Sequence, residues 1–160
     1  TILASGYLVS PKKSVVIILS KSGKTKKVFQ YKNDGNTPIF LFPYKVAENV
    51  NGDVCVIDRV EMKHGHVLSS TGELKFIYKG CGTKQLEFDP RGLCCDSAGH
   101  ILLGDYGTRS VHLLDHEGTF QTYLIKTDEE ICSMSLYMNR LWIGGKNGMI
   151  SVYHYQVSTK

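Results

Sequence analysis

The sequence predicts an all-β protein built from repeated antiparallel sheets. Short apolar runs of about five residues alternate with turns that contain glycine, which is typical of strands joined by tight connections. The runs return at roughly 40–50 residues, and almost no segment shows the 3.6-residue period of an amphipathic helix. With 42% hydrophobic and 21% charged residues in a chain of 160, the composition is that of a folded domain rather than a disordered chain.

One strand of the repeat is recognised by a turn, a short apolar run and a closing Asp or Gly. Its three clear copies cover residues 51–58, 98–105 and 138–145, and residues 2–6 form a degraded fourth copy. The closing residues of the four copies are separated by 53, 47 and 40 positions; they are Ser5, Asp58, Asp105 and Gly145. A repeat of this length indicates one supersecondary unit per copy.

Further strands surround this one in each copy. A second strand follows it at residues 15–19, 66–68, 111–114 and 150–153. A third follows in three copies, at residues 27–31, 74–78 and 120–124. In those copies a turn ending in glycine separates the second and third strands, and glycine suits a turn position with positive φ. Another strand precedes the recognised one in the last three copies, at residues 44–47, 92–95 and 132–136.

Four-stranded antiparallel sheets at this spacing are typical of β-propeller blades. We therefore expect a partial propeller of about three and a half blades within one domain, residues 1–160. The expected blades cover about 1–33, 43–79, 90–125 and 131–156. The first copy lacks its opening strand and the chain begins in mid-pattern, so we expect it to be a piece of a longer protein. Upstream blades of the same chain, or a second copy, would cover the open sheet edges.

The third and fourth copies resemble a known family. The segments Pro90–Asp96 and Gly99–Gly107, followed by Val111–Asp115 and Gly118, are similar to an NHL repeat. Residues 139–155 resemble the last blade of tripartite-motif (TRIM) proteins of the invertebrate type that end in an NHL propeller. The family usually carries Asn and Arg after the Asp, whereas here Thr108 precedes Arg109, the second copy is longer and the fourth copy has no Asp.

This resemblance implies a fold and a function. The chain would be the C-terminal part of an NHL propeller, a non-catalytic module that recognises a protein substrate or single-stranded RNA. The parent would carry a RING finger, B-boxes and a coiled coil upstream, with RING-type E3 ubiquitin ligase activity.

Tyrosines and basic residues stand at the strand junctions, which would share one rim of the propeller. Loops on a rigid scaffold often bind partners, and Tyr and Arg are favoured in protein interfaces. Aromatic planes interleaved with cations also suit single-stranded RNA. The seven lysines and absent acids of residues 1–32 equally favour an anionic partner. The candidate binding residues are Tyr44, Lys45, Arg59, Lys63, Arg91, Tyr106, Arg109, Lys146 and Asn147.

Catalytic patterns are not evident, so we expect no enzyme activity, cofactor or metal in this chain. There is no G-x-S-x-G elbow, and His64-x-His66 lacks the paired Cys/His spacing of a zinc site. Two alternatives stay open. Asp58 and Asp105 end equivalent strands, so a metal-dependent propeller enzyme of lactonase or lyase type is one. A self-associating half propeller that acts as a scaffold is the other.

The cysteines and the apolar segments indicate the cellular compartment of the protein. The five cysteines are odd in number, form no C-x-x-C motif and mostly fall in apolar runs, which indicates free thiols and a cytoplasmic protein. The longest purely apolar run, Val15–Leu19, is far shorter than the roughly 20 residues of a membrane-spanning helix, so no membrane partner is expected. Trp142 is expected to pack in the core or between blades.

Overall fold

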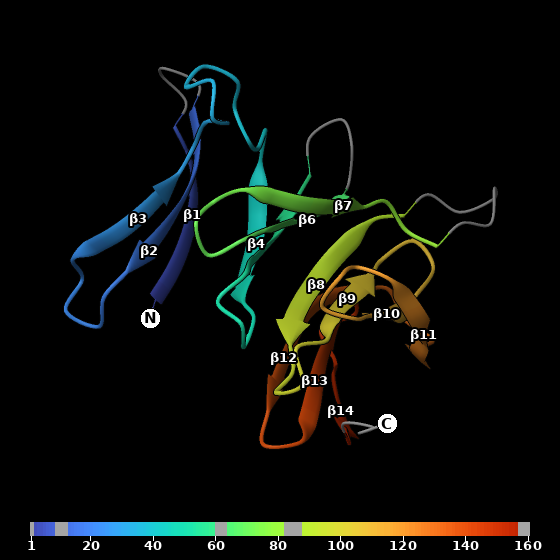
Figure 1. Cartoon of the computed structure of the whole chain (residues 1–160). Coiled ribbons are helices and arrows are strands. Elements are labelled where there is room, and N and C mark those ends of the chain that lie inside the picture. Colours follow the sequence, from blue (N-terminus) through green and yellow to red (C-terminus); the bar gives the residue numbers. More distant parts are fainter. Residues whose placement is uncertain (1, 9–12, 60–63, 82–87, 157–160) are drawn as a thin grey trace.

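The structure, a computed structural model, is all-β, which confirms the predicted fold class (Figure 1). It describes residues 2–8, 13–59, 64–81 and 88–156. In these residues fourteen strands form four antiparallel sheets, and no helix is present. The described residues therefore hold no helix that is long and apolar enough to cross a membrane.

The four sheets follow one another along the chain. The first contains β1 (Ile2–Leu8), β2 (Lys13–Leu19) and β3 (Thr25–Phe29). The second contains β4 (Pro43–Glu48), β5 (Val54–Asp58), β6 (His64–Leu68) and β7 (Leu74–Tyr78). The third contains β8 (Pro90–Cys95), β9 (Ile101–Asp105), β10 (Ser110–Leu114) and β11 (Phe120–Lys126). The fourth contains β12 (Ile131–Tyr137), β13 (Arg140–Gly145) and β14 (Ile150–His154).

The sheets contact one another through their first strands, as blades do around a common axis. β4 lies against β1 on one side and β8 on the other, and β8 in turn lies against β12. Within each sheet the strands follow one another in sequence order, from the strand that contacts the neighbouring sheets to the outermost strand, and the chain then crosses to the next sheet (Figure 1). This arrangement brings the junctions before β4, β8 and β12 to one end of the molecule.

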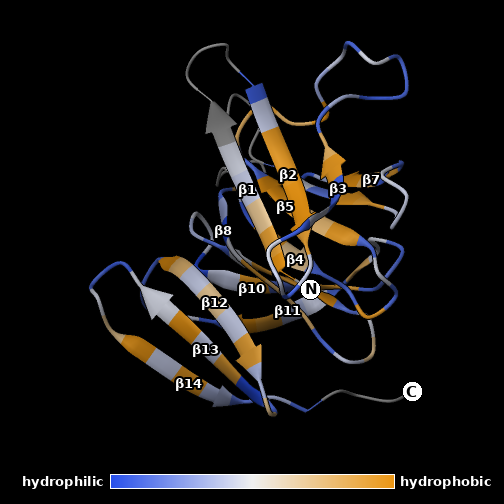
Figure 2. Cartoon of the chain, turned by 90° about the vertical axis from the view of Figure 1, so that its left-hand side faces the viewer, coloured by the Kyte–Doolittle hydropathy of each residue, from blue (hydrophilic) through white to orange (hydrophobic). Residues whose placement is uncertain are grey.

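The core consists of three apolar layers, one between each pair of neighbouring blades. In β5, Val54 and Val56 pack with residues of the first blade, while Cys55 and Ile57 pack with residues of the third. Successive side chains of a strand point to opposite faces, so a strand between two layers is apolar at every position. This explains why β5 and β9 are buried along their whole length. Figure 2 shows the hydrophobic residues gathered along the strands.

Two of the repeated turns let neighbouring blades approach closely. Gly72 and Gly118 have φ values of 101° and 87° in equivalent turns. A Cβ atom would lie 2.8 Å from the Phe29 ring at the first and 2.4 Å from the Phe76 ring at the second. Each turn therefore packs on an aromatic ring of the preceding blade, and only glycine permits both the φ and the distance.

The outer face of the last sheet is less covered than the sequence predicts (Figure 2). Leu141 and Ile143 are buried, but Trp142 between them is 40% exposed, so the expectation that it packs in the core or between blades is wrong. Ile150 and Val152 of β14 are exposed as well. The reason is that no further described sheet lies against this face.

Candidate functional site

Two buried aspartates at the ends of β5 and β9 fix the chain where it enters each blade. The Asp58 carboxylate accepts hydrogen bonds from the backbone N–H groups of Leu41 and Phe42, at 2.7 and 2.5 Å. Asp105 accepts one from the N–H of Asp89 at 2.8 Å and another from its own turn, at Gly107. These bonds hold the segments before β4 and β8, and so they position the loops at this end.

Arg91 and Tyr106 form the tightest contact at this end. Arg91 is the second residue of β8, and Tyr106 directly follows β9. The Arg91 guanidinium carbon lies 3.5 Å from the centre of the Tyr106 ring, which is a cation–π contact. Its Nη2 lies 2.8 Å from Oδ2 of Asp89. Burial opposes the charge of Arg91, but the hydrogen bond and the negative charge of Asp89, together with the nearby Tyr106 and Cys132, outweigh it and raise the pKa of the guanidinium.

A second cation–aromatic group lies on the neighbouring blade. The Arg59 guanidinium carbon is 4.8 Å from the centre of the Tyr44 ring, and Nζ of Lys45 is 5.4 Å from it. Nη2 of Arg59 also lies 3.6 Å from Oδ1 of Asp89. Asp89 therefore joins this group to Arg91, because it contacts one arginine from each blade.

A third group extends the chain of contacts to the last blade. Nζ of Lys146 lies 5.6 Å from the centre of the Tyr106 ring and 3.7 Å from Oε1 of Glu130. Glu130 also pairs with Arg109, at 3.8 Å. The neighbouring Tyr106 hydroxyl and Glu130 carboxylate raise the pKa of Lys146, so its ammonium group stays charged.

Together these residues form one continuous surface, which we name the rim array. It consists of Tyr44, Lys45, Arg59, Asp89, Arg91, Tyr106, Arg109, Glu130 and Lys146. Seven of the nine residues predicted from the sequence thus lie in it. Asn147 does not join it in any described contact: its Oδ1 accepts the N–H of Met149 and caps the turn before β14. Lys63 lies outside the described residues.

Sequence reasoning missed the two acidic members, Asp89 and Glu130. Each directly precedes the first strand of its blade, so they occupy equivalent places in two repeats. Phe42 holds the corresponding place before β4. Comparing this one position across the repeats would have revealed both carboxylates.

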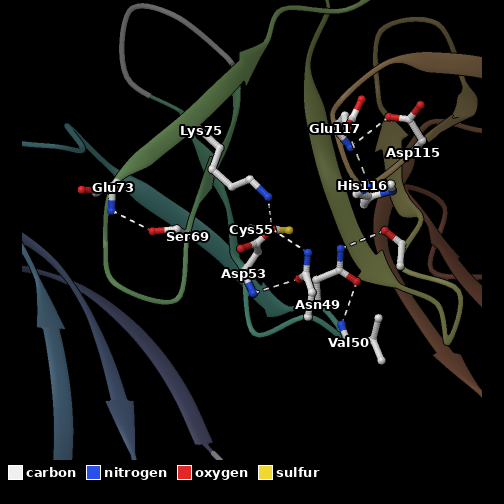
Figure 3. Close-up of polar contacts among 12 residues, drawn as sticks. Asn49, Val50, Asp53, Cys55, Ser69, Glu73, Lys75, Asp115, His116 and Glu117 are labelled. Atoms are coloured by element: carbon white, nitrogen blue, oxygen red, sulfur yellow. Dashed lines mark hydrogen bonds and ion pairs between the residues drawn. The ribbon is translucent and has the colours of Figure 1, made fainter.

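The opposite end of the molecule has polar residues of a different kind (Figure 3). Nδ2 of Asn49 donates to the carbonyl of Gly99 in the next blade at 2.8 Å, and Nζ of Lys75 lies 2.6 Å from Asp53. Asn49 and Asp53 are buried, and both are fully engaged within the chain. The Asn49 bond joins the second and third blades, and the Lys75–Asp53 pair lies within the second blade. These side chains are engaged inside the chain, which makes the rim array the stronger candidate site.

The described residues offer no metal centre: no three His, Cys, Asp or Glu side chains among them lie close enough to share an ion. His64 and His66 are neighbours on β6, with ring centres 6.4 Å apart. The nearby carboxylate of Asp58 is already taken up by two backbone N–H groups. The two histidines therefore find no third ligand in the part that the structure describes.

Comparison with known proteins supports the fold. No protein-family model matches this chain, and no curated protein does. Among solved structures, the Dos1 propeller superposes with a TM-score of 0.69 at 14% identity, over 95% of this chain and 38% of that one. U3-55K gives 0.63 at 16% identity, over 96% of this chain and 50% of that one. A streptogramin B lyase gives 0.59 at 14% identity, over 86% and 43%.

These likenesses define the class of protein: the chain is a partial β-propeller, as the repeat spacing predicts. It spans half or less of the length of these three neighbours. At such identities the likeness extends to the fold alone. The function therefore has to be argued from the rim array.

Proposed function

We propose that this chain is a non-catalytic recognition module that binds a protein partner through the rim array. The observation that supports this is the convergence of two tyrosines and five cations, from three blades, on one continuous surface. Tyr and Arg are the residue types that most often dominate binding energy in protein interfaces. Arg91 is also held in place before any partner arrives, since it donates a hydrogen bond to Asp89 and packs on the Tyr106 ring. The ion pairs of Asp89 with Arg59 and of Glu130 with Arg109 and Lys146 are longer. Such preorganisation lowers the entropic cost of binding.

The charges within the array favour a protein over single-stranded RNA. RNA-binding surfaces use ring faces on which bases stack, together with cations that neutralise phosphates. Here the Arg91 guanidinium covers the Tyr106 ring, and Asp89 lies beside both Arg59 and Arg91. A mixed surface of this kind matches a partner with charges of both signs. RNA binding is the competing outcome, and affinity that falls steeply with salt would favour it.

The parent protein is part of the same proposal. The NHL resemblance of the third and fourth blades supports a TRIM-like E3 ubiquitin ligase in the cytoplasm, with the RING upstream and this propeller as its substrate-recognition end. The propeller would be closed by upstream blades or by a second copy of the chain. The exposed Ile150 and Val152 on the last strand support such a covering.

An enzyme of lactonase or lyase type has weaker support. Propellers of that kind occur among the structural neighbours, including a streptogramin B lyase and a putative gluconolactonase. In this chain, however, Asp58 and Asp105 bind the backbone instead of facing a shared ion. A scaffold made of self-associating half propellers would not require a rim array, so we do not favour it.

Site-specific photo-crosslinking tests the proposal. A photoreactive amino acid at Lys146, within the array, should give adducts that protease digests and nuclease does not. Lys26 on β3 is an exposed lysine outside the array, so the same amino acid placed there is the matched control. Adducts at 146 that nuclease removes would contradict protein recognition, as would equal adducts at 26 and 146.

A further inference from the structure

The internal repeat places a histidine at the same point of two successive blades. His66 in β6 pairs with Val56, and His112 in β10 pairs with Leu103. Two residues earlier in each strand, His64 pairs with Asp58 and Ser110 pairs with Asp105, so β6 and β10 have the same register relative to their neighbours. The surroundings of the two histidines can therefore be compared position by position.

In the third blade the histidine is completely enclosed. His112 is 1% exposed, and the ring centres of Phe120 and Tyr123 lie 5.9 and 4.9 Å from its own. Phe88 covers it further at 5.3 Å. Its Nδ1 is hydrogen-bonded to the Tyr78 hydroxyl of the preceding blade, at 2.9 Å. Aromatic side chains thus cover this imidazole, and its Nε2 lies 3.5 Å from Oδ2 of Asp105.

In the second blade smaller residues hold the same places. Ile77 of β7 pairs with His66, as Tyr123 of β11 pairs with His112. By the same register, Leu74 of β7 corresponds to Phe120 of β11. The result is a cavity of about 350 Å³ that is open to solvent; its lining includes His66 together with Leu74 and Ile77, which are 44% and 39% exposed. A volume of this size lies within the range of small-molecule sites.

The preceding blade also lacks the hydroxyl that would complete the packing. Phe29 pairs with Val16 as Tyr78 pairs with Gly65, so a phenylalanine stands where the next blade has the tyrosine. Nδ1 of His66 is buried and has no hydrogen-bond partner in the described part of the chain. Buried polar atoms rarely lack partners, which marks this junction as incompletely packed.

The lining of the cavity contains both apolar and cationic side chains. Ile39 and Leu41, from the segment before β4, face it together with Ile77. Lys32 and Lys79 also line it, and neither forms an ion pair within the described residues. Burial lowers the pKa of His64 and of His66, so both imidazoles are neutral at pH 7. The lysines therefore supply the positive charge of the cavity.

The Asp58 carboxylate is the acidic group in this lining, and two backbone N–H groups bind its oxygens. These donors offset part of its negative charge. The exposed Asp34 carboxylate interacts with Lys32 from outside the lining and is itself hydrogen-bonded by Thr37. Lys79 forms no ion pair in the described residues. The electrostatic preference of the cavity is accordingly for an anionic group near Lys32 and Lys79.

We propose that this cavity binds a small aromatic carboxylate. Its ring takes the place that Phe120 and Tyr123 fill in the next blade, against Leu74, Ile77 and the face of His66. Its carboxylate lies between Lys32 and Lys79. This site is separate from the rim array, and the proposal does not rest on the protein-binding function.

Titration with 2-naphthoate, followed through the imidazole NMR signals of uniformly labelled protein, tests the proposal. The signals of His66 should shift, and those of the enclosed His112 should not. 2-Naphthylmethylamine has the same ring and the opposite charge, and we expect it to bind at least about tenfold more weakly, a difference of about 1.4 kcal/mol. Equal affinity for the two probes would overturn the proposal, as would no shift up to about 10 mM naphthoate.

Two variants locate the probe. Ile77→Tyr copies Tyr123 into the cavity and should abolish naphthoate binding while the thermal transition stays in place. Ile150→Tyr makes the same substitution at an exposed site on β14 and should bind as the unmodified chain does. If Ile77→Tyr does not fold, Leu74→Phe serves the same purpose. Full binding in a folded, cavity-filling variant would show that the probe lies elsewhere and would overturn the proposal.

Discussion

The Tyr78→Phe variant tests how one blade is fastened to the next. The tyrosine hydroxyl bonds Nδ1 of His112 at 2.9 Å, and that imidazole is 1% exposed, so water cannot replace the lost partner. A buried polar atom left without a partner costs about 1–3 kcal/mol. For a chain of this size, each kcal/mol lowers the melting temperature by about 2–4 °C.

Urea denaturation at pH 7 measures the effect of Tyr78→Phe. The midpoint should fall while the slope with denaturant stays the same, because the surface exposed on unfolding does not change. Tyr137→Phe removes a hydroxyl from a residue that is 65% exposed and is the matched control. A loss below about 0.5 kcal/mol, the usual range of surface substitutions, would refute the role given to this hydrogen bond.

Three further predictions concern acid stability, thiol reactivity and a turn. Burial would raise the pKa of Asp105, but its hydrogen bonds outweigh burial and lower it. Its stabilisation is therefore present above its unfolded pKa of about 3.9 and is lost as the pH falls through the lower folded value. Asp105→Asn should accordingly flatten the acid limb of a stability–pH curve; an unchanged limb would refute this. Under iodoacetamide at pH 8, exposed Cys81 should be alkylated first and the buried Cys55 and Cys94 last, because the Cys95 hydrogen bond and burial raise the pKa of Cys55 and burial raises the pKa of Cys94 to about 12; peptide mass spectrometry that found the reverse order would contradict the packing. Gly118→Ala should cost at least about 1 kcal/mol in urea denaturation, because φ is 87° and its Cβ would lie 2.4 Å from the Phe76 ring, and a neutral effect would be inconsistent with this close approach.

The fold was largely predictable because each local signal in the sequence agrees with the same repeated unit. The short apolar run in β2 and the glycine turns place the strands and their connections without tertiary information. Trp142 shows the limit of this reasoning. The pleat turns Leu141 and Ile143 to one face and Trp142 to the other, but the sequence cannot tell whether a further sheet covers that other face, and here none of the described sheets does.

The candidate site was predictable in its cations and tyrosines and not in its carboxylates. Arg91 and Tyr106 meet because equivalent strand ends share one edge, which the repeat register implies. Asp89 and Glu130 depend on contacts between blades, and those contacts are long-range. The cavity beside His66 was not predictable either, because it arises from the sizes of Leu74 and Ile77 in β7 relative to their counterparts in β11.

The central claim is that the rim array recognises a protein, and the affinity of the partner for Arg91→Ala tests it most directly. The partner identified by crosslinking would be titrated against the unmodified chain, this variant and Lys26→Ala, with thermal melts to confirm that each is folded. We predict at least a tenfold loss for Arg91→Ala, about 1.4 kcal/mol or more, because it removes a guanidinium that contacts both Tyr106 and Asp89. Lys26→Ala should bind within about twofold of the unmodified chain. Equal affinities for all three proteins would contradict the account.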